Sequence, residues 1–127
     1  GRMIYGIGTD IVAIKRLQAF WERHGDKARE RLLAPQEYAA FDAASDKGRF
    51  LAKRFAAKEA FSKALGTGIR PPATLNAIAV THDELGKPVI NCCGELEKLL
   101  KNRRLSAQLS ISDEADYAVA FVILEQA

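Results

Sequence analysis

Residues 49–65 constrain the fold more than any other part of the sequence. Large apolar side chains recur there at helical spacing with alanines between them, and alanine has the highest helix propensity. Gly66 and Gly68 follow directly, and glycine readily adopts the left-handed conformation that ends a helix. The sequence therefore predicts one long helix, against which any sheet in the chain has to pack.

The rest of the first half is predicted to hold one short strand and two helices. Residues 3–7 are expected to form the strand, and the residues up to Asp10 to turn the chain into a helix that Gly25 ends. A second helix is expected over about 35–44, because Pro35 suits the first turn of a helix.

The second half carries the pattern of antiparallel strands. Apolar and smaller or polar residues alternate on either side of a turn, in residues 78–80 and 89–90, and again in residues 105–112 and 117–124. A short helix, about 94–102, is expected between these two hairpins. Helices in one half and antiparallel strands in the other predict an α+β fold, a sheet packed on the long helix, in one domain over residues 3–127. Gly1 and Arg2 precede Met3 and are interpreted as a cloning remnant.

Composition and charge narrow the class of protein only a little. The net charge of +3 suits an anionic partner but does not separate nucleic acid from an acidic protein or a phosphorylated ligand. No apolar run approaches the roughly 18 residues that span a bilayer, so we expect a cytoplasmic protein without a membrane partner. A basic nucleic-acid-binding module is an alternative, but the basic pairs are scattered and no nucleic-acid motif is present.

Glu59 lies within the predicted long helix among small and aromatic side chains. A buried carboxylate needs a compensating cation or hydrogen bonds, and Lys63, one turn later, could supply a local ion pair. A metal ion is the other possibility, and Asp10 is the natural second ligand. An aspartate just before a helix also suits an N-cap, so the spacing alone leaves both roles open.

Two motifs resemble those of bacterial holo-acyl-carrier-protein synthases, the small trimeric type of phosphopantetheinyl transferase. They are GIGTDIV at residues 6–12 and RFAAKEAFSKALGTG at residues 54–68, and the similarity extends through GKP at 86–88 to the final hairpin. The resemblance implies a phosphopantetheinyl-transferase-like fold. It also implies an enzyme of fatty acid biosynthesis that moves phosphopantetheine from coenzyme A to a serine of an acyl carrier protein, releasing adenosine bisphosphate.

The resemblance implies roles for individual residues as well. It implies a Mg²⁺ ion held by Asp10 and Glu59, which agrees with the preference of this ion for oxygen ligands and substrate phosphates. Lys63 is expected to contact a phosphate and to act with these two residues in catalysis. The general base could be Glu59 or a metal-bound water, and this choice stays open. Besides Lys63, the residues expected to bind coenzyme A are Gly66, Thr67, Gly68, Gly86, Lys87 and Pro88.

The resemblance further implies a carrier-protein docking surface and a homotrimer with active sites between subunits. Arg16 is expected to contact the acidic helix of the carrier protein, with help from Arg23. Several relatives carry a histidine where this sequence has Asp113, so no catalytic role is assigned to that position. A non-catalytic carrier-protein adaptor is a further alternative, but it would need neither Asp10 nor Glu59.

Overall fold

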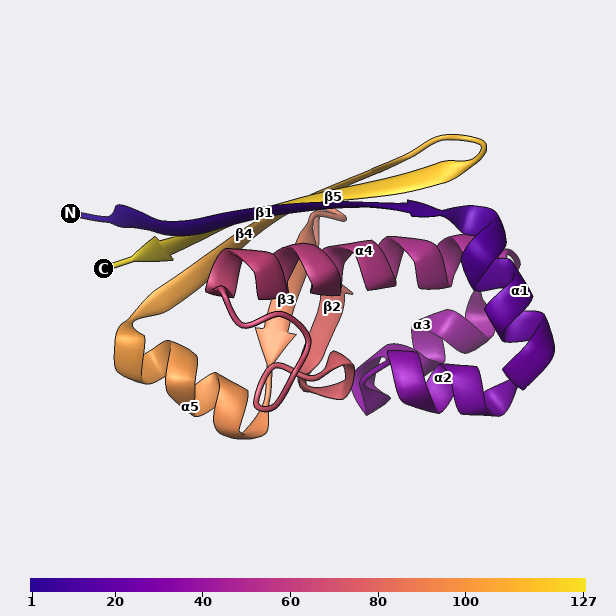
Figure 1. Cartoon of the computed structure of the whole chain (residues 1–127), viewed down its shortest axis with the longest axis horizontal. Coiled ribbons are helices and arrows are strands. Elements are labelled where there is room, and N and C mark those ends of the chain that lie inside the picture. Colours follow the sequence, from indigo (N-terminus) through magenta and orange to yellow (C-terminus); the bar gives the residue numbers. More distant parts are fainter.

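Three antiparallel strands form the main sheet, and the long helix α4 runs along one of its faces (Figure 1). The computed structural model describes all 127 residues. The strand order is β1-β5-β4, with β1 at Met3–Ala13, β5 at Tyr117–Gln126 and β4 at Leu105–Asp113. α4 spans Lys47–Leu65 and packs against all three strands. The predicted α+β arrangement is confirmed.

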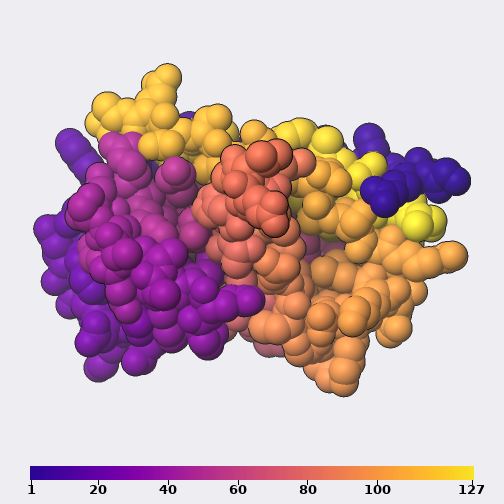
Figure 2. All heavy atoms as spheres, turned by 180° about the vertical axis from the view of Figure 1, so that it is seen from behind, coloured from indigo at the N-terminus to yellow at the C-terminus, as the bar shows by residue number.

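The remaining elements flank α4. At one end lie α1 (Ile14–His24), α2 (Asp26–Leu32), the short 3-10 helix η1 (Pro35–Glu37) and α3 (Tyr38–Ala43). The second 3-10 helix η2 (Leu75–Ala77) leads into the hairpin of β2 (Ile78–His82) and β3 (Pro88–Cys92), and α5 (Gly94–Arg103) follows. From behind, this hairpin separates the helices of the first half from α5 (Figure 2). None of the helices combines the length and the apolar character needed to cross a membrane.

Local sequence explains both ends of α4. The side chain of Asp46 caps the first turn, because its Oδ1 accepts a hydrogen bond from the backbone N of Arg49 at 3.0 Å. Gly66 ends the helix with φ 90°, the left-handed conformation that the sequence predicted for this position. Most of the residues between are buried, because the sheet covers one side of the helix and the shorter elements cover much of the rest.

β1 is longer than the sequence predicted. The strand was expected to end at Ile7 and to turn before Asp10, but it continues to Ala13 and pairs with β5 to its end. The predicted turn was wrong because it was inferred from Gly6 and Gly8, and these glycines lie inside the strand.

The glycines of β1 instead allow close packing on α4. A Cβ atom on Gly8 would overlap the carbonyl oxygen of Ala60, and a Cβ on Gly6 would overlap that of Ala64. The strand therefore lies directly on the backbone of the helix, and only glycine fits at these two positions.

The other elements follow the prediction with two differences. The helix expected over 35–44 is η1 followed by α3, and α2 was not predicted at all. α2 begins immediately after Gly25, which ends α1 with φ 53° as expected. α2 is short and mostly polar, so it shows little of the apolar periodicity on which the prediction depended.

The face of the sheet that points away from α4 is uncovered. Alternate residues of β1 and β5 place large apolar side chains there, and many of them are more than half exposed. The exposed large apolar residues at these alternate positions are Ile7 and Ile11 of β1 and Tyr117 and Phe121 of β5. The consecutive residues Met3, Ile4 and Tyr5, next to the bulge of β1, are also exposed but do not all lie on this face.

Replacing Gly8 with alanine should destabilise the fold by about 1–3 kcal/mol, because the new methyl group forces β1 away from α4. Urea unfolding followed by circular dichroism measures the change. Ser106→Ala, at an exposed position of β4, is the matched control and should shift stability by less than about 0.5 kcal/mol. Equal stability of Gly8→Ala and wild type would refute the packing argument.

Candidate functional site

Asp10 and Lys63 meet where β1 lies on α4, although they are 53 positions apart in the sequence. The Nζ of Lys63 lies 3.1 Å from Oδ1 of Asp10 and donates a second hydrogen bond of 2.9 Å to the carbonyl oxygen of Thr9. Glu59 lies one helical turn before Lys63 on the same helix. The structure therefore brings the three predicted catalytic side chains to one place.

The carboxylate of Glu59 is half-buried and lies close enough to Asp10 to be affected by its charge. Burial raises the pKa of Glu59 most, the negative charge of Asp10 raises it further, and Lys63 and Arg16 act in the opposite direction. A carboxylate whose pKa is raised in this way beside a second carboxylate would be stabilised by a cation between the two.

These two carboxylates fit a magnesium ion better than a transition metal. Nowhere do three or more His, Cys, Asp or Glu side chains gather as they would around a metal bound mainly by protein ligands. Mg²⁺ commonly takes one or two carboxylates and completes its shell with water and phosphate oxygens. Asp10 and Glu59 match that donor set.

The two alternative roles that the sequence left open are not found. The N-cap of α1 is Ala13 and has no side-chain hydrogen bond, so Asp10, inside β1, does not cap that helix. The ion pair of Lys63 is made with Asp10 on the neighbouring strand and not with Glu59 on its own helix. The carboxylate of Glu59 is thus left without an ion-pair partner.

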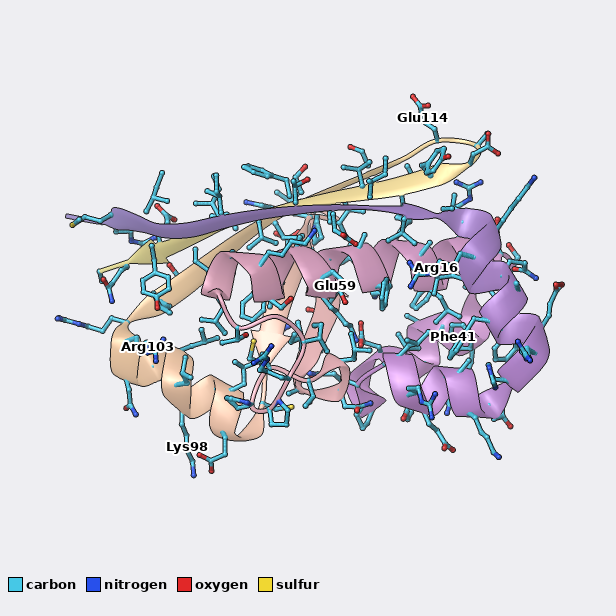
Figure 3. All side chains as sticks on the ribbon, in the orientation of Figure 1. Arg16, Phe41, Glu59, Lys98, Arg103 and Glu114 are labelled. Carbon is cyan, nitrogen blue, oxygen red and sulfur yellow. The ribbon has the colours of Figure 1, made fainter.

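Arg16 lies on α1, on the same side of α4 as Glu59 (Figure 3). Its guanidinium lies 5.5 Å from the centre of the Phe55 ring and borders a cavity of about 110 Å³. The cavity is otherwise lined by apolar side chains of α1, α2 and α4: Leu17, Phe20, Leu32 and Phe55.

Arg23 lies in the last turn of α1 and is exposed. Of the two aromatic residues of α1, Trp21 packs edge-on against Phe41 in the core, with ring centres 5.1 Å apart, whereas Phe20 lines the cavity beside Arg16. The exposed basic side chains and this cavity together make a surface that combines positive charge with apolar area.

Gly66, Thr67 and Gly68 form the turn that directly follows Lys63. Gly66 and Gly68 both have positive φ, 90° and 69°, and the backbone N of Gly68 donates to the carbonyl oxygen of Ser62 at 3.2 Å. The turn is therefore the C-terminal cap of α4 and directly follows the helical turn that carries Lys63.

Gly86, Lys87 and Pro88 lie elsewhere in the chain. Gly86 and Lys87 belong to the turn between β2 and β3, and Pro88 begins β3. In this turn Oδ1 of Asp83 accepts from the backbone N of Leu85 and of Lys87, each at 2.9 Å. Lys87 borders a cavity of about 170 Å³ whose other lining residues come from β4 and β5. Within one chain, Lys87 thus faces these strands and not Glu59.

The chain is similar to known proteins over nearly its whole length. Residues 6–122 match the family model described as the 4'-phosphopantetheinyl transferase superfamily. The holo-[acyl-carrier-protein] synthase of Dechloromonas aromatica is 73% identical over 125 residues, which cover 98% of this chain and 100% of that relative. The chain belongs to the 4'-phosphopantetheinyl transferase superfamily.

Solved structures of phosphopantetheinyl transferases of this type share the fold. The holo-[acyl-carrier-protein] synthase of Neisseria meningitidis superposes with a TM-score of 0.91 at 46% identity, covering 96% of this chain and 98% of that one. A holo-(acyl-carrier-protein) synthase of Bacillus anthracis, solved in complex with CoA (3',5'-ADP), gives a TM-score of 0.82 at 37% identity, covering 98% and 99%. The family resemblance drawn from the sequence is confirmed.

Asp113, where several phosphopantetheinyl transferases are expected to carry histidine, is an ion-paired residue in this structure. Its Oδ2 accepts from Arg49 Nη1 at 2.8 Å, and Lys53 Nζ lies 3.6 Å from Oδ1. The hydrogen bond from Arg49 holds the pKa of Asp113 below its usual value. Arg49 also donates to the carbonyl oxygen of Glu114 at 2.7 Å, so the pair fastens the β4–β5 turn to α4.

Two further features of this phosphopantetheinyl transferase were not predicted. One is a buried cluster of Glu37, Arg54 and Lys58, which sequence reasoning missed because charged side chains are usually exposed. The only available signal was that Arg54 and Lys58 lie four positions apart on a helix whose other residues are mostly apolar.

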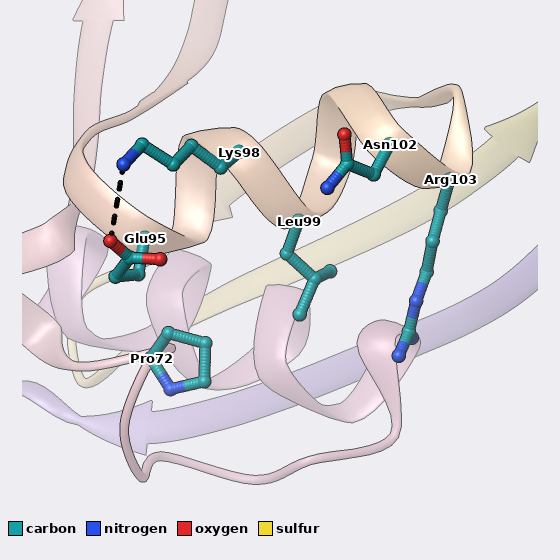
Figure 4. Close-up of a pocket in the computed structure, with 6 residues that line it drawn as sticks. All are labelled: Pro72, Glu95, Lys98, Leu99, Asn102 and Arg103. Atoms are coloured by element: carbon teal, nitrogen blue, oxygen red, sulfur yellow. Dashed lines mark hydrogen bonds and ion pairs between the residues drawn. The ribbon is translucent and has the colours of Figure 1, made fainter.

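The other feature is an open hollow of about 400 Å³ between the loop after α4 and α5 (Figure 4). Its charged groups already have partners: Lys98 pairs with Glu95 at 3.3 Å, and Arg103 donates to the hydroxyl of Tyr5 at 3.0 Å. The hollow shares no lining residue with the Asp10 site.

Proposed function

We infer that this chain is a holo-[acyl-carrier-protein] synthase, which transfers phosphopantetheine from coenzyme A to a serine of an apo-acyl carrier protein. The observation that carries this inference is the 73% identity to the Dechloromonas aromatica synthase over essentially both chains. The coenzyme A (3',5'-ADP) complex of the Bacillus anthracis relative supports coenzyme A as the donor. The cytoplasmic location stays a prediction.

The direct test is to incubate the protein with coenzyme A, Mg²⁺ and an apo-acyl carrier protein. Mass spectrometry of the carrier should show the addition of one phosphopantetheine group. Absence of the addition with both Mg²⁺ and Mn²⁺ would overturn the proposed function.

Asp10, Glu59 and Lys63 are the catalytic residues in this proposal, and the first two hold a Mg²⁺ ion. When bound, the ion supplies positive charge to the diphosphate of coenzyme A and orients it for attack by the serine hydroxyl. The side chain of Lys63 is half-exposed, so its ammonium can donate to a phosphate oxygen beside the two carboxylates.

We propose that coenzyme A lies along the turn that follows α4, Gly66–Gly68. The absence of side chains on the two glycines leaves the backbone open to close approach, and Lys63 lies in the preceding turn of the helix. The site of transfer is then the region between this turn and α1.

Arg16 and Arg23 form the proposed docking surface for the carrier protein. Both lie on α1, and Arg16 borders the apolar cavity close to Glu59. A basic surface with an apolar hollow suits an acidic helix that also presents an apolar side chain. A carrier bound there would hold its serine near the diphosphate.

A homotrimer with sites between subunits is also proposed. The uncovered apolar face of the sheet supports it, because monomeric proteins rarely expose so many neighbouring large apolar side chains. A second observation is the position of Lys87, which faces β4 and β5 of its own chain. A neighbouring copy would be needed to bring Gly86, Lys87 and Pro88 next to a bound nucleotide.

Asp10→Asn and Glu59→Gln should each lower turnover by about a hundredfold or more, because each removes one negative ligand and metal stabilisation is worth several kcal/mol. The double variant should have a turnover only slightly lower than that of the more damaging single variant, since the two ligands act as a unit. Transfer rates against Mg²⁺ concentration, with thermal melts alongside, measure both effects. Glu97→Gln, an exposed carboxamide change on α5, should keep full activity. Normal turnover of Asp10→Asn would remove the metal-site assignment.

Arg16→Glu should raise the KM for the carrier protein and leave the KM for coenzyme A nearly unchanged. Reversing a charge at a docking surface mainly slows association, so the defect should become smaller as added salt screens the new repulsion. Saturation curves for both substrates at two ionic strengths measure this. Lys101→Glu reverses a charge on α5 and should affect neither curve. Equal shifts in both curves for Arg16→Glu would contradict the docking role.

Sedimentation velocity at micromolar concentration should show a trimer for the wild type. Ile7→Asp places a charge in the uncovered apolar face and should give monomers with little transfer activity, because burying an unpaired carboxylate in an interface is costly. A monomeric wild type with full activity would contradict the trimer.

A further inference from the structure

Glu37 lies at the centre of a hydrogen-bonded network in the core beside α4. Its side chain is fully buried, and it accepts four hydrogen bonds. The backbone N of Ala34 and the Nζ of Lys58 donate to Oε1, at 2.8 and 2.5 Å. Arg54 Nε and the backbone N of Val80 donate to Oε2, both at 3.1 Å. The carboxylate is thus satisfied by four donors, one from the residue before η1, two from α4 and one from β2.

Lys58 uses every ammonium proton in this network. Besides Glu37, its Nζ donates to the carbonyl oxygen of Leu32 at 2.8 Å and to that of Leu75 at 3.0 Å. An ammonium has three donors, so none remains for another partner. The side chain is 0% exposed, and it therefore touches neither substrate.

The two carbonyls belong to one segment that lines the cavity beside Arg16 and to another that continues from the turn after α4. Leu32 is the last residue of α2, and its side chain lines the cavity beside Arg16. Leu75 begins η2 and ends the loop that starts at Gly66. The Lys58 ammonium therefore links the end of α2, which lines this cavity, to the end of the 66–74 loop, whose first residues are proposed to bind coenzyme A.

A neighbouring contact reinforces the same junction. Asn76 Nδ2 donates to the carbonyl oxygens of Glu30 at 2.7 Å and Leu33 at 2.9 Å. η2 is thus fastened to α2 twice, once through the buried Lys58 and once through the exposed Asn76.

Lys58 is also the residue before Glu59. Successive residues on a helix point about 100° apart, so the same turn of α4 presents Glu59 to the site and Lys58 to the core. The position of the Glu59 carboxylate relative to both segments is set within this one turn.

We propose that Lys58 is a positioning residue for phosphopantetheinyl transfer: its ammonium holds the end of α2 and the end of the 66–74 loop in place relative to Glu59. This role rests on the proposed function and assigns part of it to a residue that contacts no substrate. Arg54 and two backbone amides still bind Glu37 when the Lys58 ammonium is removed, so Lys58 can be replaced without leaving that carboxylate unpaired.

Lys58→Met keeps the length of the side chain and removes the ammonium. We expect the KM values for coenzyme A and for the carrier protein both to rise about tenfold, because binding must first order the two released segments and apparent affinity falls with the ordered fraction. Turnover at saturation should change less than about threefold, since no group that acts on the reacting atoms is lost. Rates are measured well below the melting temperature of each variant.

Leu96→Ala is the matched control, because Leu96 is fully buried in α5 and takes no part in the network. It should lower the melting temperature and leave both KM values unchanged. If Lys58→Met also changes only the melting temperature, Lys58 is purely structural and the proposal fails. A fall in turnover at unchanged KM would mean that Lys58 acts on the reaction through Glu59 and not on the two segments, and this result would also overturn the proposal.

Asn76→Ala tests the same junction from the surface in case Lys58→Met does not fold. Its KM values should rise in the same direction by about threefold, in proportion to the smaller loss of order, and unchanged values would count against the proposal. Hydrogen exchange gives a readout independent of activity: exchange should accelerate in residues 26–37 and 66–77 but not in 94–124. An inactive wild type rejects the proposed function, whereas an active wild type with unaltered KM and exchange in the variants rejects the role of Lys58.

Discussion

The close packing of β1 on α4 is the contact on which the rest of the structure depends. Gly6 and Gly8 let the strand lie on the helix backbone at Ala60 and Ala64, without intervening side chains. This approach places Asp10, near the end of the strand, within ion-pair distance of Lys63 on the helix. Larger residues at the two glycine positions would separate the halves of the candidate site as well as weaken the core, so stability and function depend on the same two positions.

The carboxylates of Glu37 and Glu59 lie in opposite kinds of environment. Glu37 is fully buried and satisfied by four donors, and so it is a structural group. Glu59 is only partly buried, has no ion-pair partner, and has its pKa raised by burial and by Asp10. A carboxylate kept in this state costs stability, which is typical of functional groups that await a ligand. The contrast supports assigning ligand binding to Glu59 and fold maintenance to Glu37.

Sequence periodicity predicted what depends on local pattern and missed what depends on tertiary contact. The long helix, its Gly66 cap and both hairpins were predicted, because their signals lie within a few residues. The length of β1 was not, because the reason for Gly8 is a helix backbone some fifty residues away. Spacing alone could not separate a cap from a metal ligand at Asp10, and the family resemblance was needed to choose. Neither the periodicity nor the family resemblance predicted the burial of Lys58, since nothing in its local sequence distinguishes it from an exposed lysine.

α4 explains how so short a chain can hold several charged side chains in and beside its core and still be stable. It is covered on most sides, and its faces differ in what they contact, because alanines meet the sheet, Arg54 and Lys58 enter the core network, and Glu59 and Lys63 face the site. A helix buried on most sides is normally apolar throughout. Here Arg54, Lys58 and Lys63 each have an acidic partner on another segment, and these partners hold the surrounding segments in place. The charges on α4 therefore act as connections between segments, and their hydrogen bonds and ion pairs offset the cost of burying them.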